Sequence, residues 1–183
     1  MKIRSVRFNV IMNFIYTVSS IIFPMITFPY VTRVLLVEGN GKVAAATSVI
    51  TYLTMIASLG IPTYGIRACA KVREDARRLS KTVQELLIIN TATTVVTYAV
   101  FLLLLFTVPQ FQEEQSLYAV MSINMLLNVV GVSWLYSALE QYAYITVRSL
   151  VFKILSIILM FLFVKEPADY VVYGGITVFA TSA

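Results

Sequence analysis

The chain has 183 residues, of which 59% are hydrophobic and 13% are charged, and its formal net charge is +5. Apolar residues outnumber charged ones far beyond the roughly two to one of soluble domains, which excludes an ordinary water-soluble domain. The chain has no histidine and one cysteine, Cys69, which excludes an internal disulfide, a thiolate metal cluster and histidine-based acid/base catalysis. We therefore expect an integral membrane protein that is not an enzyme and needs no metal or cofactor.

Six apolar segments follow one another along the chain. Five of them approach or exceed the roughly 20 residues that cross a hydrocarbon core as a helix. These predicted spans are residues 8–31, 43–66, 86–108, 117–139 and 143–164. The sixth segment, 170–183, has only 14 residues, so we expect either the amino-terminal piece of a longer protein or a last helix that is cut short. The predicted fold is all-α, a polytopic transmembrane bundle of about six spans that forms a single domain over residues 1–183.

Basic residues divide unevenly between the two sides of these spans. One side has eleven of the 14 lysines and arginines and the other side has three. The eleven are Lys2, Arg4, Arg7, Arg67, Lys71, Arg73, Arg77, Arg78, Lys81, Arg148 and Lys153, and the three are Arg33, Lys42 and Lys165. Because cytoplasmic loops retain lysine and arginine, we expect the amino terminus to face the cytoplasm of a bacterial plasma membrane. The basic stretch 67–81 is expected to touch anionic membrane lipids, and the distribution does not predict nucleic-acid binding.

Polar and small side chains recur at helical spacing in the first four spans. In the first span they are Asn9, Asn13, Tyr16, Ser20, Pro24 and Thr27, a mean step of 3.6 residues that places them on one face. Amides at membrane depth should face other helices or a hydrated cavity. Hydrogen bonding between helices would account for any single asparagine, whereas recurrence in four spans favours a polar path. The candidate substrate contacts on this path are Asn13, Asn124, Asn128 and Trp134.

Helix breakers accompany the polar stripes. Pro24 and Pro29 lie in the outer third of the first span, and Gly60 and Pro62 interrupt the second. Proline removes a backbone donor, and broken helices in transporters surround their binding sites. These four residues are the candidate hinges.

Six charged residues lie near the predicted membrane boundaries: Arg33, Arg67, Glu85, Glu140, Arg148 and Lys153. One interpretation is that each anchors a helix end in the headgroup layer, with Arg148 and Lys153 snorkelling or facing inward. The functional alternative is that Arg33, Arg67 and Arg148 bind a phosphate or pyrophosphate, because guanidinium groups bind such anions in bidentate fashion. Glu140 is the candidate for coupling to an ion.

Several stretches resemble one known family. They are FPYVTRVL at 28–35, EGNG at 38–41, LGIPTYGIR at 59–67 and WLYSALEQYAYITVRS at 134–149. With them the chain resembles the bacterial polysaccharide and O-antigen flippases of the multidrug/oligosaccharidyl-lipid/polysaccharide exporter superfamily. The resemblance covers essentially the whole chain, and it singles out Arg33, Gly60, Pro62, Arg67, Trp134, Tyr136, Glu140 and Arg148 as motif positions.

The resemblance implies two six-helix lobes around a central cavity that opens alternately to either side, with this chain as the first lobe. It implies a lipid-linked oligosaccharide as substrate, carried on undecaprenyl pyrophosphate, and implies the polysaccharide polymerase and glycosyltransferase machinery as partners. Two other functions remain open from the sequence. One is an antiporter of cationic drugs from the same superfamily, which would need carboxylates within the membrane, and the other is an inactive, truncated membrane scaffold.

Overall fold

The computed structural model describes residues 6–182, so Lys2, Arg4 and Ala183 lie outside the described residues. Within this range the chain is helical and contains no strand, which confirms the predicted all-α fold. The elements in chain order are α1 (Val6–Val34), α2 (Leu36–Ser58), α3 (Ile61–Lys71), α4 (Ala76–Thr107), α5 (Pro109–Glu113), α6 (Gln115–Val130), α7 (Ser133–Ala138), α8 (Tyr142–Phe163), η1 (Pro167–Asp169) and α9 (Tyr170–Thr181).

Five helical runs in the described part are long and apolar enough to cross a membrane. They are Arg7–Val34, Leu36–Lys71, Ala76–Thr107, Gln115–Ala138 and Tyr142–Phe163. The sixth apolar segment forms α9, which has 12 residues and is too short for a span, as predicted. The structure therefore confirms a bundle of about six spans whose last member is short.

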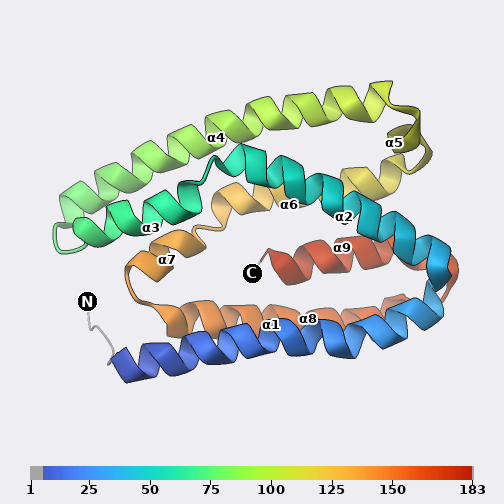
Figure 1. Ribbon diagram of the computed structural model, residues 1–183, viewed down its shortest axis with the longest axis horizontal. Helices are drawn as coiled ribbons and strands as arrows, with labels where there is room; N and C mark the ends of the chain where they lie inside the picture. The colour runs from blue at the N-terminus through green and yellow to red at the C-terminus, as the bar shows by residue number, and fades with distance from the viewer. Residues whose placement is uncertain (1–5, 183) are drawn as a thin grey trace.

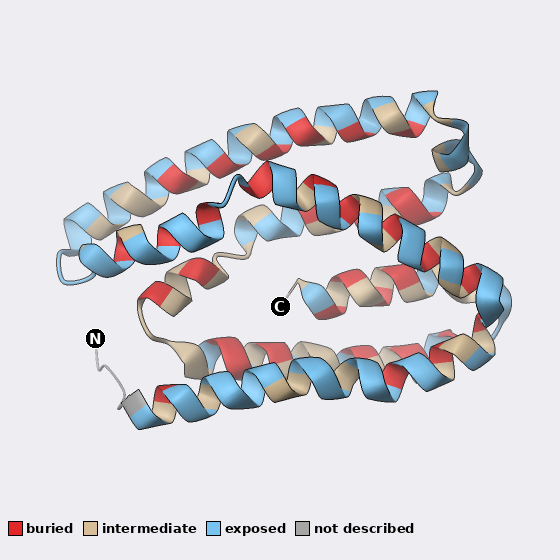
Figure 2. Cartoon of the chain, in the orientation of Figure 1, coloured by how far each residue is buried: buried red, intermediate tan, exposed pale blue. Residues whose placement is uncertain are grey.

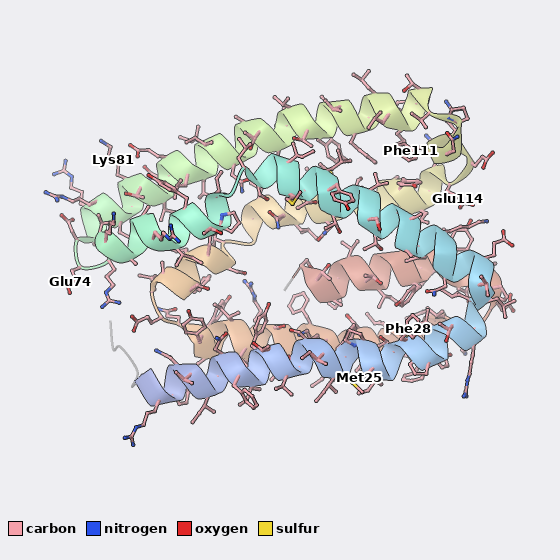
Figure 3. The ribbon with its side chains drawn as sticks, in the orientation of Figure 1. Met25, Phe28, Glu74, Lys81, Phe111 and Glu114 are labelled. Atoms are coloured by element: carbon pink, nitrogen blue, oxygen red, sulfur yellow. The ribbon has the colours of Figure 1, made fainter. Side chains whose placement is uncertain are left out.

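The helices form two groups with α9 between them (Figure 1). In one group α1 packs along α8, and in the other α2 packs against α4 and α6 while α3 packs against α4 and α7. α9 contacts α2, α6 and α8 and so joins the two groups. The α3–α4 and α7–α8 turns lie at one end of the bundle, and the α1–α2 junction, α5 and η1 lie at the other. Figure 3 shows Glu74 and Lys81 at the first end and Glu114 at the second.

Figure 2 shows the exposed and buried faces of the helices; the exposed faces carry many large apolar side chains, and the buried residues include polar as well as apolar side chains. Met25 and Phe14 on α1 are 69% and 67% exposed, although both are large hydrophobic residues. Thr94, Ser122 and Ser156 are buried between helices. Because lipid cannot form hydrogen bonds with polar groups, an apolar surface around some buried polar side chains is expected of a membrane bundle.

One predicted boundary is wrong. Residues 38–42, which lie between the predicted spans 8–31 and 43–66, belong to the first turns of α2, because the chain reverses earlier, at the fully buried Leu35 and at Leu36, whose φ is +58°. Within α2, Glu38 forms an ion pair with Lys42 one turn later at 2.9 Å. The span predicted at 117–139 corresponds to the run Gln115–Ala138, within which the chain leaves the helix at Gly131 and Val132, between α6 and α7.

The candidate hinges differ in local structure. Leu59 and Gly60 have φ values of +44° and +71° and separate α2 from α3, with Pro62 in the first turn of α3. In contrast, α1 continues without interruption through Pro24 and Pro29. The structure thus has a backbone break at one of the two predicted places, and the hinge function of all four residues stays a prediction.

Candidate functional site

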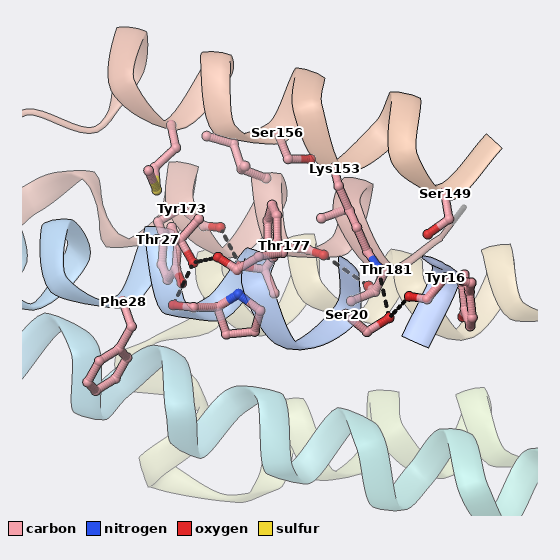
Figure 4. Close-up of a pocket in the computed structure, with 15 residues that line it drawn as sticks. Tyr16, Ser20, Thr27, Phe28, Ser149, Lys153, Ser156, Tyr173, Thr177 and Thr181 are labelled. Atoms are coloured by element: carbon pink, nitrogen blue, oxygen red, sulfur yellow. Dashed lines mark hydrogen bonds between the residues drawn. The ribbon is translucent and has the colours of Figure 1, made fainter. Parts of the chain in front are cut away.

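A cavity of about 390 Å³ lies between α1, α8 and α9 (Figure 4). Its lining includes Tyr16, Ser20, Phe23, Pro24, Thr27, Phe28, Ser149, Lys153, Ser156, Met160, Tyr173, Ile176, Thr177, Ala180 and Thr181. Tyr16, Ser20, Pro24 and Thr27 are members of the polar stripe recognised in the first span. Part of the stripe therefore lines this cavity, which we call the α8 cavity.

Lys153 projects from α8 into this cavity. Its Nζ donates hydrogen bonds to the Oγ atoms of Ser19 and Ser20 on α1, at 3.1 and 2.9 Å, and lies 5.1 Å from the centre of the Tyr16 ring. Both serine hydroxyls donate to the carbonyl of Tyr16, at 2.7 and 2.9 Å, which turns their lone pairs toward the ammonium. No aspartate or glutamate belongs to the cavity lining, so among the described residues neutral groups alone hold this positive charge.

Arg148 lies on α8 one turn and a half before Lys153 and is also held by neutral groups. Its Nη2 donates to Ser133 Oγ at 2.7 Å, and its guanidinium carbon lies 5.5 Å from the centre of the Tyr144 ring. Its Nε is buried and has no hydrogen-bond partner among the described residues. An unpaired buried donor is costly, so Arg148 retains the capacity to bind an acceptor.

A second cavity, of about 210 Å³, opens where α6 breaks before α7. Its polar lining is supplied by Asn90, Asn124, Asn128, Ser133, Trp134, Thr181 and Ser182. Asn128 Oδ1 accepts a hydrogen bond from Ser58 at 3.2 Å, while the buried Asn90 Oδ1 has no partner in the described part of the chain. We call this space the amide cavity, and Arg148 reaches its edge through Ser133.

The structure brings some predicted site residues together. Asn124, Asn128 and Trp134 all line the amide cavity. Trp134 is only 6% exposed, however, and packs in a hydrophobic cluster that includes Ile61 and Leu86. Asn13 is exposed on α1 and lines a different cavity, of about 290 Å³, together with Asn9, Val10, Glu140 and Tyr142.

Other predicted site residues lie apart. Arg33 is exposed at the end of α1 next to the α1–α2 junction, and Arg67 is exposed on α3, which lies at the opposite end of the bundle. Glu140, in the α7–α8 turn, binds Arg73 Nη1 at 2.7 Å. Arg33 and Arg67 therefore lie at opposite ends of the bundle, and Glu140 is paired with a basic residue at the α3–α4 end.

Sequence reasoning placed Lys153 near the membrane boundary and did not include it in the site. A usable pattern was present, because Ser149, Lys153 and Ser156 are spaced four and three residues apart and so share one face of α8. Thr177 and Thr181 of α9 also share a face, four residues apart, but only the packing of α9 against α8 brings that face to the cavity. Within residues 6–182 no group of three or more His, Cys, Asp or Glu side chains could hold a metal ion.

Comparisons with known proteins agree with the resemblance seen in the sequence. The family described as "Polysaccharide biosynthesis protein" matches residues 6–183. A protein of Shigella dysenteriae named as an O-antigen transporter is 26% identical over 163 residues, which are 89% of this chain and 41% of that relative. One of Escherichia coli K12 with the same name is 22% identical over 172 residues, or 94% of this chain and 41% of the relative. The chain thus spans about two fifths of the length of these relatives.

No solved structure matches the chain significantly. The family match covers nearly all of the sequence, and both relatives are named for transport rather than for catalysis. The apolar helices show the multi-pass architecture that such a transporter needs. By these observations the chain belongs to the polysaccharide biosynthesis protein family.

Proposed function

We propose that the protein takes part in moving an oligosaccharide linked to undecaprenyl pyrophosphate across the bacterial cytoplasmic membrane by alternating access. Its amino terminus would face the cytoplasm, and its substrate would pass to the polysaccharide polymerase after assembly by glycosyltransferases. Membership of the polysaccharide family supports the substrate class. The single observation that carries the proposal is the position of Arg148, an uncompensated cation at the edge of an amide-lined cavity inside the bundle.

Arg148 suits the anionic part of such a substrate. Its Nη2 is bound to a neutral hydroxyl and its Nε donor is free among the described residues. A guanidinium binds phosphate oxygens through parallel hydrogen bonds, and each charge-assisted bond is stronger than a neutral one. Arg33 and Arg67 lie at the two ends of the bundle, where they would contact the anionic group only on arrival or departure.

The amide cavity suits the sugar part. Asn90, Asn124 and Asn128 offer both donors and acceptors, as sugar hydroxyls require, and they carry no charge that would hold a substrate too tightly. Trp134 forms one wall of this cavity, and Asn13 extends the polar surface along α1. In this proposal Gly60 and Pro62 allow α3 to move relative to α2.

Cation antiport is less well supported. A cationic drug would need a carboxylate in the membrane interior, but neither the α8 cavity nor the amide cavity is lined by one in the described part of the chain. Glu140 is bound to Arg73 at 2.7 Å, and Glu85 is exposed with Lys81 at 3.9 Å. Both carboxylates therefore already have basic partners, and coupling through Glu140 would require its release from Arg73.

Replacement of Arg148 tests the proposal. The protein would be expressed from its complete gene in a bacterium that lacks its own flippase, and surface polysaccharide would be measured with membrane insertion as a second readout. We expect Arg148→Ala to lower export about 10-fold or more, as the loss of a charge-assisted hydrogen bond of about 1.5–3 kcal/mol implies. Arg148→Lys should restore export only in part, because lysine lacks the bidentate geometry.

Arg77→Ala is the matched control, since Arg77 is exposed at the start of α4. It should leave export unchanged. Normal export by an Arg148→Ala protein that inserts normally would remove Arg148 from the site and the proposal with it.

A further inference from the structure

The α8 cavity changes in polarity along its length. The side chains at one end are mostly polar and include Tyr16, Ser20, Lys153 and Thr181. The side chains at the other end include four large apolar ones, Phe23, Phe28, Met160 and Ile176. Figure 4 shows Lys153 and Tyr16 toward one end of the cavity and Phe28 at the other. Apolar walls with a few polar groups that fix orientation are typical of ligand sites, and this arrangement matches a ligand with a polar head and an apolar chain.

The two threonines at the apolar end do not require a polar ligand. Thr27 donates its hydroxyl proton to the carbonyl of Phe23 at 3.1 Å, and Thr177 donates to the carbonyl of Tyr173 at 3.0 Å. Both donors are therefore satisfied within their own helices. A hydrocarbon chain could lie against these side chains without leaving a hydroxyl donor unpaired, which would be costly.

The α8 cavity is open along α1. Phe28 is 59% exposed, and Ser20 and Pro24 are also exposed, whereas Met160 on the α8 side of the cavity is 1% exposed. A long chain can therefore enter sideways past α1 and does not need to thread through the bundle. The volume of about 390 Å³ accommodates a segment of such a chain, and the rest would remain in the bilayer.

The polar end of the α8 cavity adjoins the site proposed above for the substrate. Thr181, at the end of α9, lines both the α8 cavity and the amide cavity. Ser149, which follows Arg148 on α8, lines the α8 cavity. Arg148 itself donates to Ser133, which lines the amide cavity. Arg148 thus lies next to residues of both cavities.

We propose that the α8 cavity binds the first isoprene units of the lipid-linked substrate, while the diphosphate lies at Arg148 and the sugars lie in the amide cavity. This inference rests on the proposed function, which gives a place to the sugars and the diphosphate but none to the chain. The amide cavity, the guanidinium and the α8 cavity follow one another in the order of the sugars, the diphosphate and the chain. A phospholipid carries no sugars and would leave the amide cavity unused.

Photolabelling tests the inference. The protein would be expressed from its complete gene, held in lipid nanodiscs and irradiated with a polyprenyl diphosphate that carries a diazirine on its first isoprene units. Mass spectrometry would identify the labelled residues, and we expect labels on Phe23, Met160 and Ile176. Excess polyprenyl diphosphate without the diazirine should prevent this labelling, whereas phosphatidylglycerol at the same concentration should not.

A larger side chain in the cavity should prevent binding of the chain. We expect Thr177→Phe to weaken binding about tenfold, because the ring occupies the space in which the chain would bury its apolar surface. Val172→Phe is the matched control, since Val172 is on the same helix but is 44% exposed and does not line the cavity. It should bind the probe as the unaltered protein does. Thr181→Phe, at an exposed position of the lining, keeps the test decisive if Thr177→Phe does not fold.

A polyprenyl alcohol separates this inference from the proposed function. Thr177→Phe should weaken the binding of both the diphosphate and the alcohol, whereas Arg148→Ala should weaken only that of the diphosphate. The inference is overturned if both cavity variants bind normally, if the labels fall outside the α8 cavity, or if phosphatidylglycerol prevents labelling equally well. Labelling of the cavity together with normal export by Arg148→Ala would instead overturn the proposed function and leave the chain site in place.

Discussion

At the scale of single residues, Gly65 shows why Trp134 is part of the core. A Cβ atom at Gly65 would lie 2.7 Å from Cε3 of Trp134, so the indole lies directly on the α3 backbone. Ile61, Cys69 and Ala138 complete the same hydrophobic cluster. The close contact joins α3 to α7, and the absent side chain of Gly65 is what permits it.

Gly65→Ala should therefore destabilise the protein by about 1–3 kcal/mol, the usual cost of overpacking a core. Gly41→Ala is the control, because Gly41 also lies inside a helix but a Cβ there would meet nothing within 4 Å. It should be neutral or slightly stabilising, since alanine favours helix more than glycine. Unfolding in detergent, followed by the fluorescence of the single tryptophan, measures both. Equal midpoints for the two variants would contradict the contact.

At the scale of elements, three junctions in the described chain use residues other than glycine in the left-handed region. Leu36, Leu59 and Glu140 have φ values of +58°, +44° and +56°. They lie at the first residue of α2, between α2 and α3, and between α7 and α8. This conformation costs roughly 1–2 kcal/mol for a residue with a side chain, so each junction has a strained backbone that the surrounding packing maintains.

Leu59→Gly should relieve this strain and leave stability unchanged or raised by up to about 1 kcal/mol, since Leu59 is 65% exposed and loses little packing. Met55→Gly, one turn earlier and 63% exposed, should instead lower stability by about 1 kcal/mol, as glycine does inside a helix. Thermal unfolding of the two variants in the same detergent distinguishes them. A comparable loss in both would show that the chain at Leu59 is not strained.

At the scale of the whole molecule, Glu114 joins distant elements at the end opposite the α3–α4 turn. It accepts hydrogen bonds from Lys42 Nζ of α2 at 2.8 Å and from Tyr170 of α9 at 2.7 Å, and it precedes α6. Partial burial acts to raise the pKa of Glu114, but the hydrogen bonds from Lys42 and Tyr170 outweigh it and lower that pKa. At the same end, backbone hydrogen bonds from Lys165 and Glu166 lower the pKa of Asp169.

These lowered pKa values predict lower stability in acid. A carboxylate whose folded-state pKa is depressed contributes its full stabilisation above the unfolded-state value, about 4.3 for glutamate, and loses it as the pH falls through the folded-state value. Glu114→Gln should therefore cost about 1 kcal/mol at pH 7 and lose less stability in acid than the unaltered chain. Glu113→Gln is the control, because Glu113 is exposed next to Glu114. It should change neither the stability at pH 7 nor the loss of stability in acid. Unfolding midpoints between pH 7 and pH 3 supply the measurement, and identical profiles for both variants would contradict the network.

Local patterns predicted some features of the site and missed others. The spacing of Tyr16, Ser20 and Thr27 correctly predicted a polar face on α1, because helical periodicity alone decides which side chains share a face. The same reasoning grouped Arg33 with Arg67, although these residues lie at opposite ends of the bundle, because the position of each charge depends on where its helix begins and ends. It also missed Lys153, whose hydrogen-bond partners Ser19 and Ser20 lie on a different helix, α1.

The sequence by itself determined that the chain is a bundle of about six apolar helices, since hydrophobic length dictates which segments enter lipid. It also determined the family, through motifs that extend along almost the whole chain. Only the tertiary structure decided that α9 lies between two helix groups, that Lys153 faces a cavity without a carboxylate, and that Glu114 joins α2 to α9. The physical reason is that these features depend on contacts between residues far apart in the sequence, such as those of Lys153 with Ser19 and Ser20. No local pattern encodes which helices become neighbours.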